Sequence, residues 1–351
     1  LRMALLDVDT LFPPGERDAG AVKSGEAGRE GKRPESGAAR PLSVRVNLGI
    51  DAGKARGLEF RDLRGVAIYE RHTLFLDSVQ ARMYGGEVSV TGHIGLAGPS
   101  PDFRVKASLK NVEAGEILSR KTSLGGLLSG PVTLAAELGG KAGDFSEFAR
   151  TAEGSGSFRV PGGTIRGVDL LGTAIGLAGL SSLLPPSVAG KGDEKAKETP
   201  FGELAADFRV RGGRIETDAL RIVSSKMGFT GNAALRFDRT IEVRGMLRLS
   251  DDLSGRARKG VGKFLTGKSG EVEIPLVLSG PVTGPEVAID AGTLARGVAG
   301  ELLRGAAEKL RGPAEPIPKD NAATRVPGDA KERPGPKEEL EGLFRKLLPG
   351  R

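Results

Sequence analysis

The chain has 351 residues, a formal net charge of +7, 38% hydrophobic residues and only 4% aromatic residues. It contains no Cys, which excludes disulfides, thiolate zinc sites and thiol nucleophiles. Its 54 glycines are more than double the usual share of about 7%, so we expect a thin apolar surface spread along the chain. The basic excess is a mild bias toward anionic partners such as phospholipid headgroups or nucleic acid.

The N-terminal segment begins "LRMALLDVDTLFPP", and residues 1–12 are predicted to be the end of a preceding β region. Because residue 1 is Leu, we expect the chain to be a piece of a longer protein, with any membrane anchor before residue 1. Residues 13–41 carry almost no large apolar side chains and are predicted to be a flexible linker. The nearest candidate for a membrane span, residues 170–184, is uncharged and is ended by Pro185-Pro186. It is too short and too rich in Gly and Ser to cross a bilayer alone.

Residues 42–184 follow a period of two, which predicts strands with one dry and one wet face. The pattern begins in "LSVRVNLGID" (42–51) and returns in "FRVKASL" (103–109) and "PVTLAAEL" (131–138). Gly85-Gly86 is predicted to be a tight connection, or a bulge, between a strand ending near Tyr84 and one starting at Val88. Residues 167–184 are predicted to form a helix that closes this first β segment.

A second linker is predicted at residues 185–200, followed by a second β segment over 201–311. Its strands include "ELAADFRV" (203–210), "IEVRGMLRL" (241–249) and "EVEIPLVL" (271–278). Helices are predicted over 251–265, where Asp251 and Asp252 suit the first turn, and over 293–311, which ends the segment. Residues 312–351 are predicted to be a disordered tail with one short amphipathic helix.

A repeat links the two segments. "LFLDSVQARMYGGEVSVTGHIGL" (74–96) resembles "IETDALRIVSSKMGFTGNAALRF" (215–237), and the repeated unit is a hairpin. The predicted fold class is therefore mainly β: an extended, curved antiparallel sheet of repeated hairpins, forming a groove or half-open barrel, with a few short helices.

The sequence contains few of the residue patterns that catalytic sites require. The two histidines, His72 and His93, have no carboxylate set at metal spacing, and no Gly-x-Ser-x-Gly elbow lies between a strand and a helix. Single-strand nucleic-acid binders need aromatic platforms, yet the chain has two Tyr and no Trp. We therefore expect a protein that is not an enzyme, with no cofactor, no metal and no nucleic-acid partner.

An ordered set of segments resembles the C-terminal region of the AsmA-like proteins of Gram-negative bacteria. These segments are the run from "LSVRVNLGID" to "VTGHIGL", then "VPGGTIRGVDL" (160–170), "TPFGELAADFRVRGGRIETDALRI" (199–222) and "EIPLVLSGPVTGPEVAID" (273–290). The resemblance covers most of residues 1–295. It implies a periplasmic β-rich body that is anchored to the inner membrane in the full-length protein. It also implies an apolar groove that binds or conducts phospholipid between the inner and outer membranes.

The dry strand faces are the candidate lipid-binding site. The predicted lining consists of Val44, Val46, Leu48, Val88, Val90, Ile94, Val105, Leu109, Val132, Leu134, Phe208, Val210, Ile241, Val243, Ile274 and Leu276. Periodicity alone allows another interpretation, in which these residues form the cores of two β-sandwiches. A scaffold or chaperone-like module for outer-membrane protein assembly is the alternative function, with outer-membrane or periplasmic assembly proteins as partners.

Overall fold

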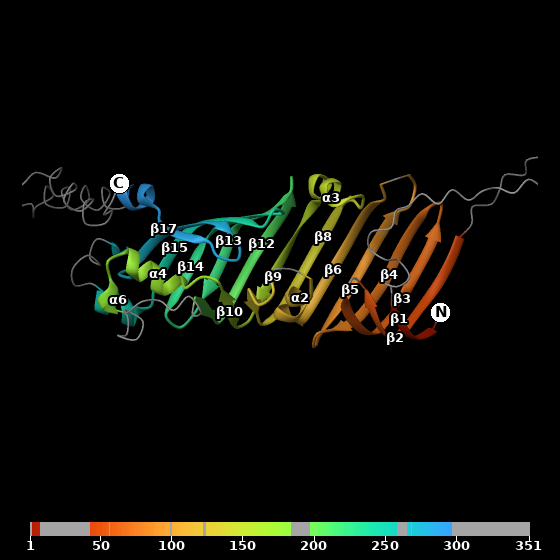
Figure 1. Cartoon of the computed structure of the whole chain (residues 1–351), viewed down its shortest axis with the longest axis horizontal. Coiled ribbons are helices and arrows are strands. Elements are labelled where there is room, and N and C mark those ends of the chain that lie inside the picture. Colours follow the sequence, from red (N-terminus) through yellow and green to blue (C-terminus); the bar gives the residue numbers. More distant parts are fainter. Residues whose placement is uncertain are drawn as a thin grey trace, which may run out of the picture.

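The fold was analysed in a computed structural model that describes residues 2–7, 43–55, 57–98, 100–121, 124–183, 197–257, 265–267 and 269–296. The strands lie side by side along the longest axis, with the N-terminal strands at one end and the C-terminal strands at the other (Figure 1). They form one sheet of fourteen strands in the order β1-β2-β3-β4-β5-β6-β8-β9-β12-β13-β14-β15-β16-β17. The predicted fold class, mainly antiparallel β with few short helices, is confirmed, and the sheet is not closed into a barrel.

The first half of this sheet runs from β1 to β9. Its strands are β1 (Arg2–Asp7), β2 (Ser43–Ala55), β3 (Leu58–Glu70), β4 (Thr73–Met83), β5 (Gly86–Gly95), β6 (Asp102–Glu113), β8 (Pro131–Lys141) and β9 (Glu153–Val160). All neighbouring pairs are antiparallel except β1 and β2, which are parallel. Two helices that the sequence analysis missed lie at its margins, α2 (Ala114–Lys121) and α3 (Phe145–Thr151).

The second half contains β12 (Glu203–Arg211), β13 (Arg214–Val223), β14 (Met227–Arg236), β15 (Thr240–Leu249), β16 (Glu273–Pro281) and β17 (Glu286–Ile289). A small second sheet, in the order β11-β10-β7, runs beside it and consists of β7 (Leu128–Ser129), β10 (Gly163–Arg166) and β11 (Glu198–Phe201). The predicted linker 185–200 is thus too long at its C-terminal end, because β11 starts at Glu198. Since β9 pairs with β12, the predicted segments 42–184 and 201–311 share one sheet.

Helices occur within each of the three ranges where the sequence predicts them. Within 167–184 the structure has α4 (Leu170–Leu177) and a 3-10 turn, η1 (Ser181–Leu183). Within 251–265 it has α6 (Asp251–Ala257), with Asp251 and Asp252 in the first turn as predicted. A helical turn covers residues 291–296, and the rest of the helix predicted at 293–311 lies outside the described residues, as do the 13–41 linker and the 312–351 tail.

Tight turns connect the hairpins. Tyr84 and Gly85 join β4 to β5 with φ angles of 44° and 81°, and Gly212 and Gly213 join β12 to β13 with φ angles of 57° and 76°. Two successive residues with positive φ match the backbone twist of flanking antiparallel strands. The predicted tight connection between the two strands is confirmed, but its turn residues are Tyr84 and Gly85, because Gly86 is already the first residue of β5.

The repeat detected in the sequence corresponds to two hairpins, β4–β5 and β13–β14. Each first strand carries a register irregularity at matching positions of the repeat, between Leu76 and Val79 in β4 and between Thr217 and Leu220 in β13. A β-bulge adds a residue and bends the strand. The repeated unit is therefore a bulged hairpin, which contributes curvature at two places in the sheet.

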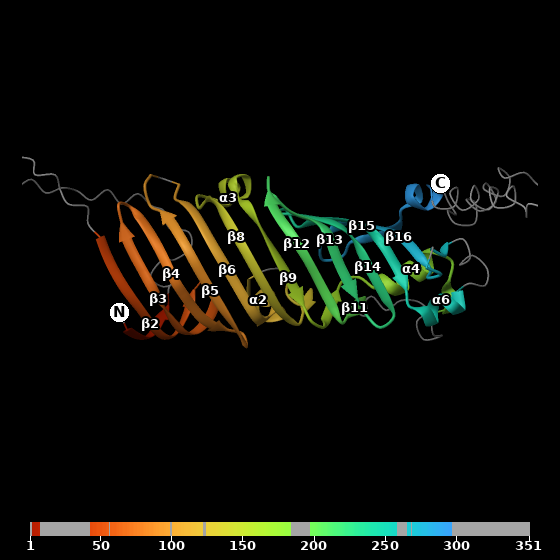
Figure 2. The same cartoon turned by 180° about the vertical axis from the view of Figure 1, so that it is seen from behind.

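The sheet is curved around its apolar face. Phe148 of α3 stacks at a ring-centroid distance of 6.2 Å on Phe103 of β6 and at 5.9 Å on Phe237, which follows β14. Neighbouring strands lie about 4.8 Å apart, so in a flat sheet β6 and β14, five strands apart, would be separated by about 24 Å. One helix can bridge them only because the sheet bends between these strands. Figure 2 shows α3 at the rim, beside the ends of β8 and β12.

Candidate functional site

The strand pairing places all sixteen predicted lining residues on one face of the sheet. Residues directly opposite each other in neighbouring strands share a face, and the pairs can be followed from strand to strand. Val88 lies opposite Leu109, which lies opposite Leu134 of β8. The same chain of pairs continues through β9 and β12 to β16, where Val243 lies opposite Leu278 and Leu247 opposite Ile274. We call this continuous surface, from β2 to β17, the apolar face.

Over β2 to β5 the apolar face is open. Val46, Leu48, Val90 and Ile94 are only half-buried, and Val44 is 41% exposed. Among the described residues, no helix packs across these four strands. Val105, Leu109, Val132 and Leu134 of β6 and β8 are likewise half-buried.

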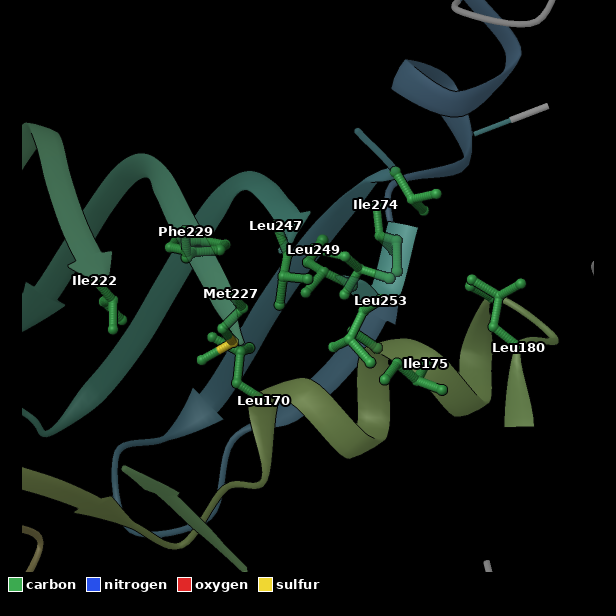
Figure 3. Packing of buried hydrophobic residues seen from close by; sticks show 14 of the residues in the cluster. Leu170, Ile175, Leu180, Ile222, Met227, Phe229, Leu247, Leu249, Leu253 and Ile274 are labelled. Atoms are coloured by element: carbon green, nitrogen blue, oxygen red, sulfur yellow. The ribbon is translucent and has the colours of Figure 1, made fainter. Parts of the chain in front are cut away.

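Over β12 to β16 the apolar face is covered. Val210, Val243, Ile274 and Leu276 are at most 7% exposed. The last three belong to a buried cluster, and Ile241 is half-buried at its margin. Leu170 and Ile175 of α4 and Leu253 of α6 pack in the same cluster as Met227, Leu247 and Leu249 (Figure 3). The C-terminal part of the apolar face is thus an ordinary hydrophobic core, with helices as its second layer.

Hydrogen bonds hold the covering helices in place. Asp169 caps α4 by accepting from the Gly172 amide at 2.9 Å. The buried Thr199 hydroxyl of β11 accepts from the Leu170 amide at 2.9 Å and donates to the Val168 carbonyl at 2.7 Å. In α6, the buried Ser254 hydroxyl accepts from the Val272 amide at 2.9 Å. The helices are therefore fixed parts of this region, since removing a partner would leave a buried polar group unsatisfied.

An aromatic pair marks the boundary between the open and the covered parts. Phe208 of β12 contacts Phe158 of β9 at a centroid distance of 6.4 Å. The Phe208 ring lies over Gly156, where an added Cβ would come within 2.7 Å of the ring. Phe208 was predicted as a lining residue, and it lies on the apolar face. Its ring packs against Phe158 and Gly156 of the protein itself.

Several residues of the apolar face were missed from the sequence, above all in β3 and β4. Leu74 and Leu76 lie opposite Ile94 and Gly92, and after the bulge Val79 lies opposite Val90. The extra residue changes the phase of the alternation in "LFLDSVQARM", so no single period of two fits the strand. The sequence signal of this bulge was Asp77-Ser78, two turn-forming residues between the apolar residues Leu76 and Val79. Ser78 has a φ of 54°.

The opposite face is polar and charged. Arg104 and Lys106 of β6 lie 3.8 and 3.5 Å from Glu137 of β8, and Arg248 of β15 lies 2.8 Å from Glu273. These side chains are at least one quarter exposed, so each pair contributes at most about 1 kcal/mol. The charged side chains keep this face hydrated, so only the other face can contact apolar ligands.

The histidines lie away from the apolar face. His93 is on the polar face, 6.2 Å from the Phe75 ring, and His72 is in the β3–β4 turn with a φ of 61°. No group of three or more His, Cys, Asp or Glu residues able to hold a metal ion occurs within the described part of the chain. The site that the geometry presents is therefore a surface, defined by apolar area and by what covers it.

Comparison with known proteins places this architecture in a family. The family model described as "AsmA family" matches residues 21–220, more than half of the chain. The chain belongs to the AsmA family. AsmA proteins belong to the cell envelope and are generally non-catalytic. The AsmA match spans β2 to β12 and most of β13, and so includes the whole open part of the apolar face.

Two further comparisons gave no match, one with curated proteins and one with solved structures. Across the helices that the structure describes, none is long and apolar enough to span a membrane.

Proposed function

We propose that this AsmA-family chain binds phospholipid acyl chains along the open part of its apolar face and carries them within the cell envelope, between the inner and outer membranes. The observation that carries the proposal is the continuity of the apolar face across β2 to β9, combined with the absence of a covering helix over β2 to β5 in the described residues. Each buried methylene of an acyl chain contributes about 0.8 kcal/mol, so such a face can hold a lipid without specific polar contacts.

The chemistry of the open part suits movement of the ligand along it. Its side chains are mostly Val, Leu, Ile and Ala, which make non-directional contacts. An acyl chain shifted along such a surface exchanges one set of similar contacts for another. The polar groups that would hold a headgroup in one place lie on the opposite face of the sheet.

Single tryptophans provide a direct test, because the natural chain contains none. We expect the fluorescence of a Val90→Trp variant to be quenched by phospholipid vesicles whose acyl chains carry bromine. Thr91→Trp is the matched control, since Thr91 lies next to Val90 in β5 but on the polar face, opposite Lys106. Equal quenching at both positions, or none at either, would contradict the proposal.

The alternative, a scaffold for outer-membrane protein assembly, is supported by the ends of the sheet. β1 and β17 are edge strands, and within the described residues each pairs on one side only. An open edge can accept an added strand from another protein. Crosslinks from the edge strand β1 to barrel precursors, together with the absence of lipid quenching at position 90, would favour this alternative.

A further inference from the structure

A separate cavity lies at the covered end of the molecule, away from the open part of the apolar face. It has a volume of about 750 Å³ and lies between α4, β11, the turn at residues 224–226 and α6. Its size is within the range of about 300 to 1,000 Å³ that is usual for small-molecule sites. The cavity is separate from the open part of the apolar face, and residues of the buried cluster supply part of its wall.

The cavity is apolar inside. Its walls include Leu171 and Ile175 of α4, Leu183 of η1, Met227 of β14 and Leu253 of α6. Four of these five belong to the buried cluster, and Leu171 packs against it. The interior therefore suits an aliphatic chain and offers no buried charge to a polar ligand.

The rim carries charges of both signs. Lys226 and Arg256 supply cations, Asp252 supplies a carboxylate, and Ser225 adds a hydroxyl. Asp252 and Arg256 are 4.0 Å apart with side chains 82% and 57% exposed, so their ion pair is weak and both remain able to bind a ligand. A second carboxylate of the rim, Asp169, is already engaged as the cap of α4.

We propose that this cavity binds one acyl chain of a phospholipid whose headgroup carries both a phosphate and a primary ammonium. The acyl chain enters between α4 and α6, the phosphate meets Lys226, and the ammonium donates hydrogen bonds to Asp252. A rim with only positive charges would favour a purely anionic lipid, and a rim without charge would not select a headgroup. The inference rests on the proposed function, because it names the lipid class that the same protein retains at its covered end.

The test uses a reporter at the rim of the full 351-residue chain. The chain has no Cys, so a Ser225→Cys variant can carry one environment-sensitive fluorophore. The probes are lysophospholipids with one palmitoyl chain and an ethanolamine, glycerol or choline headgroup, all used below their micelle concentrations. We expect the ethanolamine lipid to bind about fivefold more tightly than the other two, the gain from one exposed charged contact.

Two pairs of variants decide the outcome. Gly202→Leu should abolish the signal by filling the mouth of the cavity. We expect the fold to accept the change, because a Cβ there meets only the Val223 carbonyl oxygen, at an ordinary contact distance of 3.6 Å. Gly228→Leu, which has open space and lies outside the cavity, should leave the signal unchanged. Asp252→Asn should remove the preference for ethanolamine, whereas its neighbour Asp251→Asn in the same helical turn should keep it.

Equal affinity for the three headgroups, or a signal that survives Gly202→Leu, would overturn the inference. Quenching at Trp-substituted position 90 with a silent reporter at position 225 would also overturn it, while leaving the proposed function intact. The reverse result, a headgroup-selective reporter without quenching at position 90, would support the cavity site and remove the proposed carriage along the open face.

Discussion

The two halves of the apolar face are built from the same sequence pattern and end in different environments. Leu109 of β6 and Leu247 of β15 both lie on this face in long antiparallel strands, yet Leu109 is half-buried and Leu247 is fully buried. The difference comes from α4 and α6, which pack on the second half only. Alternation therefore identifies the dry face of a strand, and a separate element decides whether protein or ligand covers it.

The largest expected effect is a difference in the loss of unfolding free energy when a leucine of each half is truncated. Leu247→Ala should lower the free energy of unfolding by about 2–5 kcal/mol, because it leaves a cavity in a packed core. Leu109→Ala, the same change on the open part, should cost only about 1 kcal/mol, since much of the side chain is already exposed. Urea denaturation of the two variants measures both values. Equal losses would mean that the open part is covered in solution.

Each element could be predicted from the sequence only where its apolar periodicity extends over enough residues. Strands such as β2 and β15 alternate over ten or more residues, so their faces could be assigned correctly. Helices α2 and α3 have only eight and seven residues, too few to show a helical period. For α3 a local signal existed, because Asp144 accepts from the Glu147 amide at 2.7 Å in an Asp-x-x-Glu cap.

The division of the apolar face could not be read from the strands. Residues 170–184 were predicted as a helix, but an uncharged helix can pack on either half of such a sheet. Its position is fixed by contacts far apart in sequence, such as the bond between the Leu170 amide and the Thr199 hydroxyl. The bulge at Ser78 was also missed, and with it the contribution of β4 to the open part.

An effect of intermediate size concerns crowding of the backbone. Adding a Cβ to a closely packed glycine should destabilise both halves by the same mechanism. Gly92 of β5 and Gly231 of β14 occupy matching places in the repeated hairpins. A Cβ on Gly92 would lie 2.7 Å from the Val105 Cα, and one on Gly231 would lie 2.6 Å from the Gly245 Cα. Gly231→Ala should cost about 1–3 kcal/mol through this overlap. Gly92→Ala should cost about 1 kcal/mol more, because its φ of 147° also disfavours a side chain.

Gly228→Ala is the control for both glycine variants, since a Cβ at Gly228 meets nothing within 4 Å. It should change the unfolding free energy by less than about 1 kcal/mol. Thermal and urea unfolding of the three variants would show whether backbone crowding follows the repeat. If Gly92→Ala were neutral while Gly231→Ala was costly, backbone crowding would be a property of the covered half alone.

The smallest expected effect is a pH dependence confined to the covered half. Asp238, in the β14–β15 turn, accepts hydrogen bonds from the Thr240 hydroxyl at 2.6 Å and the Thr240 amide at 2.9 Å, and these bonds lower the pKa of its carboxyl group. A lowered pKa means that the folded state favours the ionised form. Its contribution to stability is complete above the unfolded value of about 3.9 and is lost as the pH falls through the folded pKa.

Asp238→Asn should therefore reduce the difference between the urea midpoints measured at pH 6 and pH 3, and Thr240→Val should reduce it as well. The repeat matches the β14–β15 turn to the connection between β5 and β6, and residues 96–101 of that connection contain no carboxylate, so acid should not weaken it in this way. Hydrogen exchange at the Thr240 amide would locate the change, because that amide is one of the two donors. If acid accelerated exchange equally in β5 and β15, the loss of stability would be global, and the two halves would unfold as one unit despite their different coverings.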